Sequence, residues 1–190
     1  MIELLHDVLL VLWVFIPAGV ANMVPIFAAH IPSLRNFTAP IDGGKTFRGK
    51  RIFGPHKTWR GLLTGIVAAI LMLGLQQLLV AYVPPFRWIA DGMDYSYAAL
   101  PTVLVGSLFA IGALGGDALK SFFKRQVGVA PGKSWFPFDQ LDYIVGGAVA
   151  VLPFIQLSVF QYVLLVLFWL GIHVLSTWLG WLMHLKDSPI

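Results

Sequence analysis

Three aspartates stand at the ends of long apolar segments, where a carboxylate facing lipid would be costly. Asp117 follows "GALGG", and Asp139 and Asp142 lie in "PFDQLDYIVGG" at the start of the next apolar run. Their three-residue spacing places Asp139 and Asp142 on one face of a helix's first turn. Carboxylate and phosphate oxygens are the ligands that Mg²⁺ prefers. Asp117, Asp139 and Asp142 are therefore candidate metal ligands.

Each aspartate alone also has a structural explanation. Asp139 has the position of an N-cap, and Asp142 lies near a helix N-terminus, where the helix dipole stabilises a negative charge. For either residue alone the sequence leaves both explanations open. Three carboxylates at two adjacent membrane boundaries, beside many cations, favour a site.

The segment 35–60 contains seven Lys and Arg residues against Asp42 alone. It holds two similar units, "KTFRG" at 45–49 and "KTWRG" at 57–61. Each unit offers a mobile lysine charge and a planar arginine fork, a combination suited to a polyphosphate. Neighbouring glycines would let backbone N–H groups approach phosphate oxygens. The alternative is a basic juxtamembrane loop that binds anionic lipid head groups.

The second charged segment is "GGDALKSFFKRQVGVAPGKSWFPFDQLD", residues 115–142. Lys120 and Ser121 follow Asp117 at helical spacing, and Lys124 and Arg125 follow one turn later. Further on, Pro131, Gly132 and Pro137 predict a break in the helix before the chain re-enters the apolar region. Of the five histidines, only His56 lies within a charged segment.

The composition predicts an all-α, polytopic membrane protein with a single domain over residues 1–190. The chain is 58% hydrophobic and 12% charged, with a mean hydropathy of +0.80. It has no cysteine, which excludes a disulfide, a thiol nucleophile and a thiolate metal site. Because a span needs about 20 apolar residues, we expect five transmembrane helices, near residues 8–29, 62–83, 98–119, 143–157 and 160–182. The fourth is the shortest and contains Pro153.

The distribution of charge predicts the orientation of these spans. Both basic segments lie between spans on the same side, whereas the N-terminus has no basic side chain. The positive-inside rule places the basic segments and Lys186 in the cytoplasm and the N-terminus outside. Five spans satisfy this arrangement. We expect the cell (plasma) membrane as the location.

Two stretches carry a resemblance to a known family. "DGGKTFRGKRIFGPHKTWRG" (42–61) and "GDALKSFFKRQVGVAPGKSWFPFDQLD" (116–142), with its S-x-x-K-R and D-x-x-D elements, resemble the cytoplasmic motifs of the CDP-archaeol synthase family. These enzymes are related to the phosphatidate cytidylyltransferases. The resemblance implies transfer of CMP from CTP to a lipid phosphate, with Mg²⁺ as cofactor and pyrophosphate as the second product.

The resemblance also implies roles for individual residues. Asp117, Asp139 and Asp142 would organise metal and phosphates, and Lys124 would join them as a catalytic residue. The nucleotide phosphates would be bound by Lys45, Arg48, Lys57, Thr58, Arg60, Ser121, Arg125 and Lys133. Ser134 follows Lys133 where bacterial phosphatidate enzymes have an acidic residue, which favours an ether-linked isoprenoid acceptor of the 2,3-bis-O-geranylgeranylglycerol 1-phosphate type. Pro55 and His56 depart from the polar pair expected before "KTWRG".

The sequence has three alternative functional interpretations. One is a phosphatidate cytidylyltransferase that acts on a diacyl acceptor. A CDP-alcohol phosphotransferase is disfavoured because its aspartates repeat at four-residue spacing after a D-G-x-x-A-R element, whereas Asp139 and Asp142 are three residues apart and this element is absent. A transporter or lipid-binding scaffold would need ionisable residues inside the spans, where this chain has almost none. The expected partners are CTP, the lipid phosphate and membrane lipids, with no nucleic acid; a homodimer is left open.

Overall fold

The computed structural model of the chain describes residues 1–91, 96–130 and 133–182. Pro131, Gly132 and Lys186, which entered the sequence-based expectations, lie outside these residues. The described elements are α1 (Ile2–Ala28), β1 (Thr46–Phe47), β2 (Lys50–Arg51), α2 (Trp59–Tyr82), α3 (Pro84–Ala90), a 3₁₀ turn (Tyr97–Ala99), α4 (Thr102–Gln126), α5 (Phe138–Val151) and α6 (Val159–Leu182).

The all-α prediction is confirmed, but the count of five spans is not. Among the described residues, four helices are long and apolar enough to cross a membrane: α1, α2, α4 and α6. Helix α5 has 14 residues, and at about 1.5 Å per residue it is shorter than the roughly 30 Å hydrocarbon layer. It begins at Phe138, five residues before the expected start, and ends at Val151. Pro153 explains that end, because proline lacks the N–H and restricts the residue before it.

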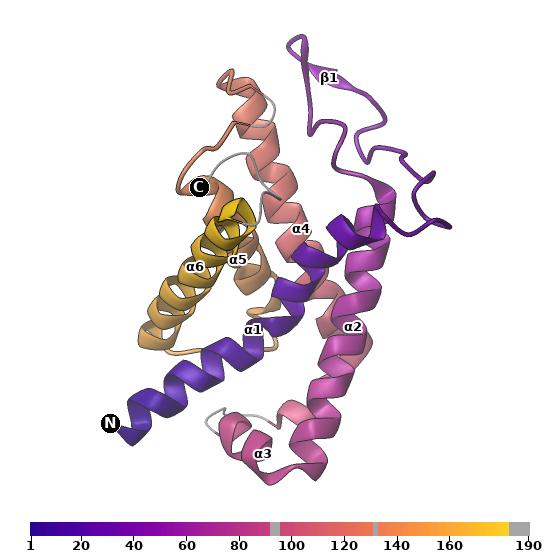
Figure 1. Ribbon diagram of the computed structural model, residues 1–190. Helices are drawn as coiled ribbons and strands as arrows, with labels where there is room; N and C mark the ends of the chain where they lie inside the picture. The colour runs from indigo at the N-terminus through magenta and orange to yellow at the C-terminus, as the bar shows by residue number, and fades with distance from the viewer. Residues whose placement is uncertain (92–95, 131–132, 183–190) are drawn as a thin grey trace.

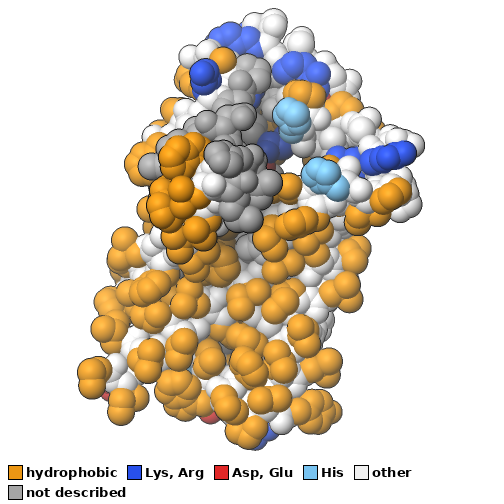
Figure 2. All heavy atoms as spheres, viewed as in Figure 1, with side chains coloured by type: hydrophobic (Ala, Val, Ile, Leu, Met, Phe, Trp, Pro, Cys, Tyr) orange, Lys and Arg blue, Asp and Glu red, His pale blue; other side chains and the backbone are white. Residues whose placement is uncertain are grey.

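The helices form one bundle with two distinct ends (Figure 1). One end carries the segment with β1 and β2, the last turns of α4 and the start of α5, while α3 lies at the other end. In the same orientation, Lys and Arg side chains gather at the first end, above a body covered by hydrophobic side chains (Figure 2). The two basic segments therefore lie on one side of the bundle, as the sequence predicted.

Helix α1 runs through the centre of the bundle. Its residues Leu10, Val11, Phe15 and Ala18 are fully buried. The ring of Phe15 lies 6.0 Å from that of Phe109 on α4, 6.3 Å from Tyr143 on α5 and 5.4 Å from Trp169 on α6, between ring centroids. One aromatic side chain thus joins three other helices.

Glycines bring α4 and α5 into backbone contact. A Cβ atom added to Gly116 would collide with the carbonyl oxygen of Asp142, and one added to Gly146 would collide with the carbonyl oxygen of Gly112. Gly112 and Gly116 are four residues apart and share one face of α4. The interface is therefore of the small-residue type found between membrane helices. A Cβ at Gly115 would meet no atom within 4 Å, so Gly115 takes no part.

Candidate active site

The start of α2 is held by the segment that precedes it. The N–H of Ile41 donates to the carbonyl of Lys57 (2.8 Å), and the N–H of Trp59 donates to Ala39 (3.0 Å). The hydroxyl of Thr58 caps α2 by accepting the N–H of Gly61 (3.2 Å), as N-cap residues do. These contacts fix Lys57 immediately before the N-cap residue of α2.

Asp42 organises the glycine-rich loop between these points. Its side chain is buried, and its two oxygens accept from Arg51 Nη2 (2.8 Å) and from the N–H groups of Gly44 (3.0 Å), Phe53 (3.0 Å) and Gly54 (3.2 Å). Burial alone would raise the pKa of Asp42, but these hydrogen bonds outweigh it and hold the pKa well below its usual range. The N–H groups of Gly44 and Gly54, expected to face phosphates, bind this carboxylate instead.

The two similar sequence units adopt different structures. "KTFRG" forms a hairpin in which Thr46 pairs with Arg51 and Phe47 pairs with Lys50. Its two turn residues, Arg48 and Gly49, have φ angles of 51° and 75°, as in a type I′ turn. "KTWRG" instead caps and begins α2. The repetition in sequence is therefore not a structural repeat.

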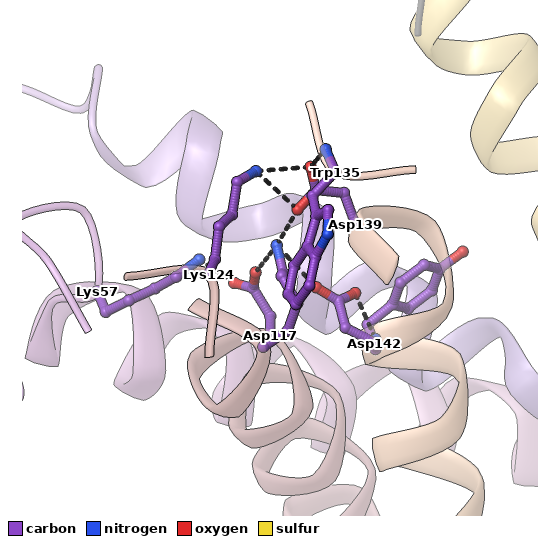
Figure 3. A network of polar contacts seen from close by, with 8 residues as sticks. Lys57, Asp117, Lys124, Trp135, Asp139 and Asp142 are labelled. Atoms are coloured by element: carbon purple, nitrogen blue, oxygen red, sulfur yellow. Dashed lines mark hydrogen bonds and ion pairs between the residues drawn. The ribbon is translucent and has the colours of Figure 1, made fainter. Parts of the chain in front are cut away.

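Charged side chains from α4, α5 and the start of α2 meet in one cluster (Figure 3). Lys57 forms an ion pair with Asp117. Lys120 Nζ lies 3.2 Å from Asp117 Oδ1, 2.8 Å from Asp139 Oδ1 and 3.0 Å from Asp142 Oδ2. Lys124 Nζ lies 2.7 Å from Asp139 Oδ2. The three aspartates proposed from the sequence are thus brought together.

Asp139 is not the N-cap of its helix. The cap residue of α5 is Pro137, and Asp139 lies in the first turn. Its Oδ2 accepts the N–H of Trp135 (2.6 Å) and a hydrogen bond from Lys124. The residue therefore both orders the segment before α5 and belongs to the charged cluster.

Asp142 is the most buried carboxylate of the cluster, with 5% of its side chain exposed. Its Oδ1 accepts the N–H of Tyr143 (2.5 Å). Its Oδ2 receives no hydrogen bond, although Lys120 Nζ lies 3.0 Å away as an ion pair. The ammonium of Lys120 therefore supplies the charge that balances this buried carboxylate.

The donor set suits a hard cation such as Mg²⁺ in its chemistry, because three carboxylates converge. Within the described ranges, however, no three His, Asp or Glu side chains are arranged so that they could hold a metal ion. The point on which the three carboxylates converge is taken by the ammonium of Lys120. A metal at this point would have to replace Lys120.

A cavity of about 500 Å³ adjoins the cluster. Asp117, Asp139 and Asp142 line it from α4 and α5, and Lys57, Thr58 and Arg60 line it from the start of α2. Another part of its wall is apolar and includes Pro25, Ile26 and Leu114. The cavity can therefore accommodate a ligand with an anionic part and a hydrocarbon part.

Lys124 and five further predicted site residues do not line this cavity. Arg48 lies at the hairpin turn, with its guanidinium 5.3 Å from the centre of the Phe47 ring. Arg125 Nη1 donates to the carbonyl of Val129 (3.1 Å). Ser121 is buried on α4, while Lys45 and Lys133 are exposed. Phosphate binding by these five residues stays a prediction.

Sequence reasoning missed two residues of the site. Lys120 was noticed for its spacing, but only the packing of α4 against α5 shows that it contacts all three aspartates. His173 of α6 also lines the cavity, and its ring centroid lies 5.6 Å from that of Tyr143. An ionisable residue within an apolar span is itself a signal of function, so the sequence alone could have indicated His173.

Comparison with known proteins gives a consistent result. The family model described as CarS-like, CDP-archaeol synthase, matches residues 1–190. A CDP-archaeol synthase of Pyrococcus furiosus is 31% identical over 186 residues, covering 97% of this chain and 99% of the relative. One of Methanoculleus marisnigri is 38% identical over 134 residues, covering 70% of this chain and 75% of the relative.

A solved structure is also similar. It is that of an intramembrane enzyme for archaeal membrane lipid biosynthesis, with a TM-score of 0.67 and 27% sequence identity. The similarity covers 86% of this chain and 90% of that chain. Because the family model spans the whole chain and a relative aligns almost end to end, the chain belongs to the CDP-archaeol synthase family of CTP-dependent cytidylyltransferases.

Proposed function

We propose that this cavity binds CTP and an ether-linked isoprenoid glycerol phosphate of the 2,3-bis-O-geranylgeranylglycerol 1-phosphate type, and joins them to a CDP-archaeol-type lipid. The observation that carries the proposal is the cavity itself, which places Lys57 and Arg60 and the three aspartates beside an apolar wall at one end of the bundle. Pro25, Ile26 and Leu114 would contact the start of the lipid chains. CTP would enter from the side that carries the basic segments.

The reaction needs no nucleophile from the protein. An oxygen of the lipid phosphate forms a bond to the α-phosphorus of CTP, and the bond from that phosphorus to the bridging oxygen of the β-phosphate breaks. Pyrophosphate leaves with the electron pair. The obstacle is repulsion between two anions, which lysine and arginine side chains reduce by offsetting charge on the phosphates. Lys57 and Arg60 have the positions for this role.

We propose Mg²⁺ as the cofactor, held by Asp117, Asp139 and Asp142. When bound, it would offset charge on the reacting and departing phosphates. Support comes from the convergence of these carboxylates on one point. We further propose that the N-terminus lies outside the plasma membrane and that the site faces the cytoplasm, on the basis of the Lys and Arg distribution.

The experiment is an assay of purified protein with CTP labelled in the α-phosphate. Two acceptors are supplied side by side, the isoprenoid ether phosphate and a diacyl phosphatidic acid of matched head group. We expect a labelled CDP-lipid that requires Mg²⁺, formed at a higher rate from the ether acceptor. A preference for the diacyl acceptor would reassign the protein to that substrate, and no product from either would contradict the proposed function.

Lys57 and Lys45 provide a matched pair, since each begins one of the two similar sequence units. Lys57 lines the cavity and contacts Asp117, whereas Lys45 is exposed on the loop. We expect Lys57→Gln to lower the rate of CMP transfer roughly 100-fold, as loss of a charge-stabilising group does. Lys45→Gln should lower the rate far less, because Lys45 does not line the cavity. Steady-state rates at saturating and limiting CTP measure both, and equal losses would show that the cavity is assigned wrongly.

A further inference from the structure

Lys120 occupies an unusual place in the charged cluster. Its Nζ lies within 3.2 Å of carboxylate oxygens from Asp117, Asp139 and Asp142, and 15% of its side chain is exposed. Asp117 is on the same helix as Lys120, whereas Asp139 and Asp142 belong to α5. One ammonium thus joins carboxylates from the two helices that form the site.

The charges of the cluster balance only when Lys120 is counted. Asp117 also contacts Lys57, and Asp139 also contacts Lys124. Among the described residues, Asp142 forms an ion pair with Lys120 alone. Without Lys120, three buried or half-buried carboxylates would share two cations, which is unfavourable at low dielectric.

A metal shared by these aspartates would take the carboxylate oxygens that Nζ contacts. Mg²⁺ binds carboxylate oxygens at about 2.0–2.1 Å, so a metal shared by these aspartates would lie within the volume that the ammonium fills. Two cations at one point repel strongly when buried. The lysine side chain is a flexible four-carbon stem, so its ammonium can move away while the helix stays in place.

We propose that Lys120 is a displaceable counter-ion of the metal site: it competes with the divalent cation for the three carboxylates and moves away when the metal binds. The inference rests on the proposed function, because it takes these aspartates as the metal ligands. Lys120 is thus a positioning residue that holds the carboxylates of α4 and α5 together. Its release places a mobile cation beside the metal, where phosphates would lie.

The first test measures Mn²⁺ binding to the full-length protein in detergent by titration calorimetry, without CTP. Lys120→Met is compared with Lys124→Met, which removes the same charge nearby but from a side chain that contacts Asp139 alone among the aspartates. We expect Lys120→Met to bind Mn²⁺ about tenfold more tightly than wild type, the size typical of coupling between ligands. Lys124→Met should change the affinity far less. Equal or weaker binding by Lys120→Met would overturn the competition.

A second measurement needs no lysine variant and decides the question if Lys120→Met does not fold. Wild-type protein is treated with a limiting amount of acetic anhydride, and acetylation of each lysine is followed by mass spectrometry. Adding Mn²⁺, compared with KCl of equal ionic strength, should raise the acetylation rate of Lys120 several-fold, because its ammonium leaves the carboxylates. Lys45, which is exposed on the loop, serves as the internal control. An unchanged rate at Lys120 would contradict the displacement.

Asp142→Asn separates failure of this inference from failure of the metal site. If Asp142→Asn abolishes Mn²⁺ binding but Lys120→Met does not tighten it, the metal site stands and only the competition is wrong. If Mn²⁺ binds equally well to Asp142→Asn, the metal lies elsewhere and both ideas fail. The CMP-transfer assay is independent of either result.

Discussion

Asp142→Asn is expected to lower the rate of CMP transfer by roughly 10²–10³-fold while the protein stays folded. The substitution keeps the shape of the side chain but removes the charge of the most buried carboxylate in the cluster, whose Oδ2 receives no hydrogen bond. An amide there binds a metal more weakly and cannot balance Lys120. Steady-state rates with labelled CTP measure the effect, and the thermal unfolding midpoint reports on folding.

Asp7→Asn is the matched control for this variant. Asp7 lies on α1 near the N-terminus, and its Oδ1 accepts from Gln161 Nε2 (2.7 Å). An asparagine can still accept this hydrogen bond through its carbonyl oxygen. We therefore expect a rate near that of wild type. Near wild-type activity in Asp142→Asn would show that the carboxylate serves only the structure of α5.

Gly116→Ala is expected to reduce both activity and stability, although it adds only one methyl group. The new Cβ would collide with the carbonyl oxygen of Asp142 and would lie 3.2 Å from the Cα of Gly146. Helix α5 must then move away from α4, which separates Asp142 from Asp117. Overpacking of this kind costs about 1–3 kcal/mol of unfolding free energy. A displacement of about 1 Å at the site can lower the rate roughly 100-fold.

The neighbouring glycine supplies the control. An added Cβ at Gly115 would meet no atom within 4 Å, so Gly115→Ala should keep the wild-type rate. It should also unfold at an equal or higher temperature, because alanine favours the helix by up to about 1 kcal/mol over glycine. Thermal unfolding and CMP transfer are measured for both variants. Equal behaviour of the two would contradict the view that contact between α4 and α5 sets the geometry of the site.

Much of the architecture followed from local sequence properties. Hydropathy identified the segments that form α1, α2, α4 and α6, because a membrane requires long apolar helices whatever their neighbours are. The two charged segments were also found, together with the motif resemblance that the family match confirms. The fourth span was wrong in extent, since α5 begins earlier and ends before Pro153.

Pairings between distant residues could not be read from local patterns. The similarity of "KTFRG" and "KTWRG" suggested one role for both, but Asp42 and the hairpin turn hold the first unit away from the cavity, while Thr58 makes the second a helix start. His173 lies in an apolar span 31 residues after the end of the second charged segment, so its place in the cavity wall depends on how α6 packs.

The sequence by itself determined that this is a helical membrane protein with an acidic and basic site at one end, and it named the three aspartates of that site. Only the tertiary structure decided how they are used. The glycine contact between α4 and α5 places Asp142 opposite Asp117 and makes Lys120 their common partner. The reason is physical: hydropathy and charge act along the chain, whereas ion pairing depends on distances of a few ångströms that helix packing sets.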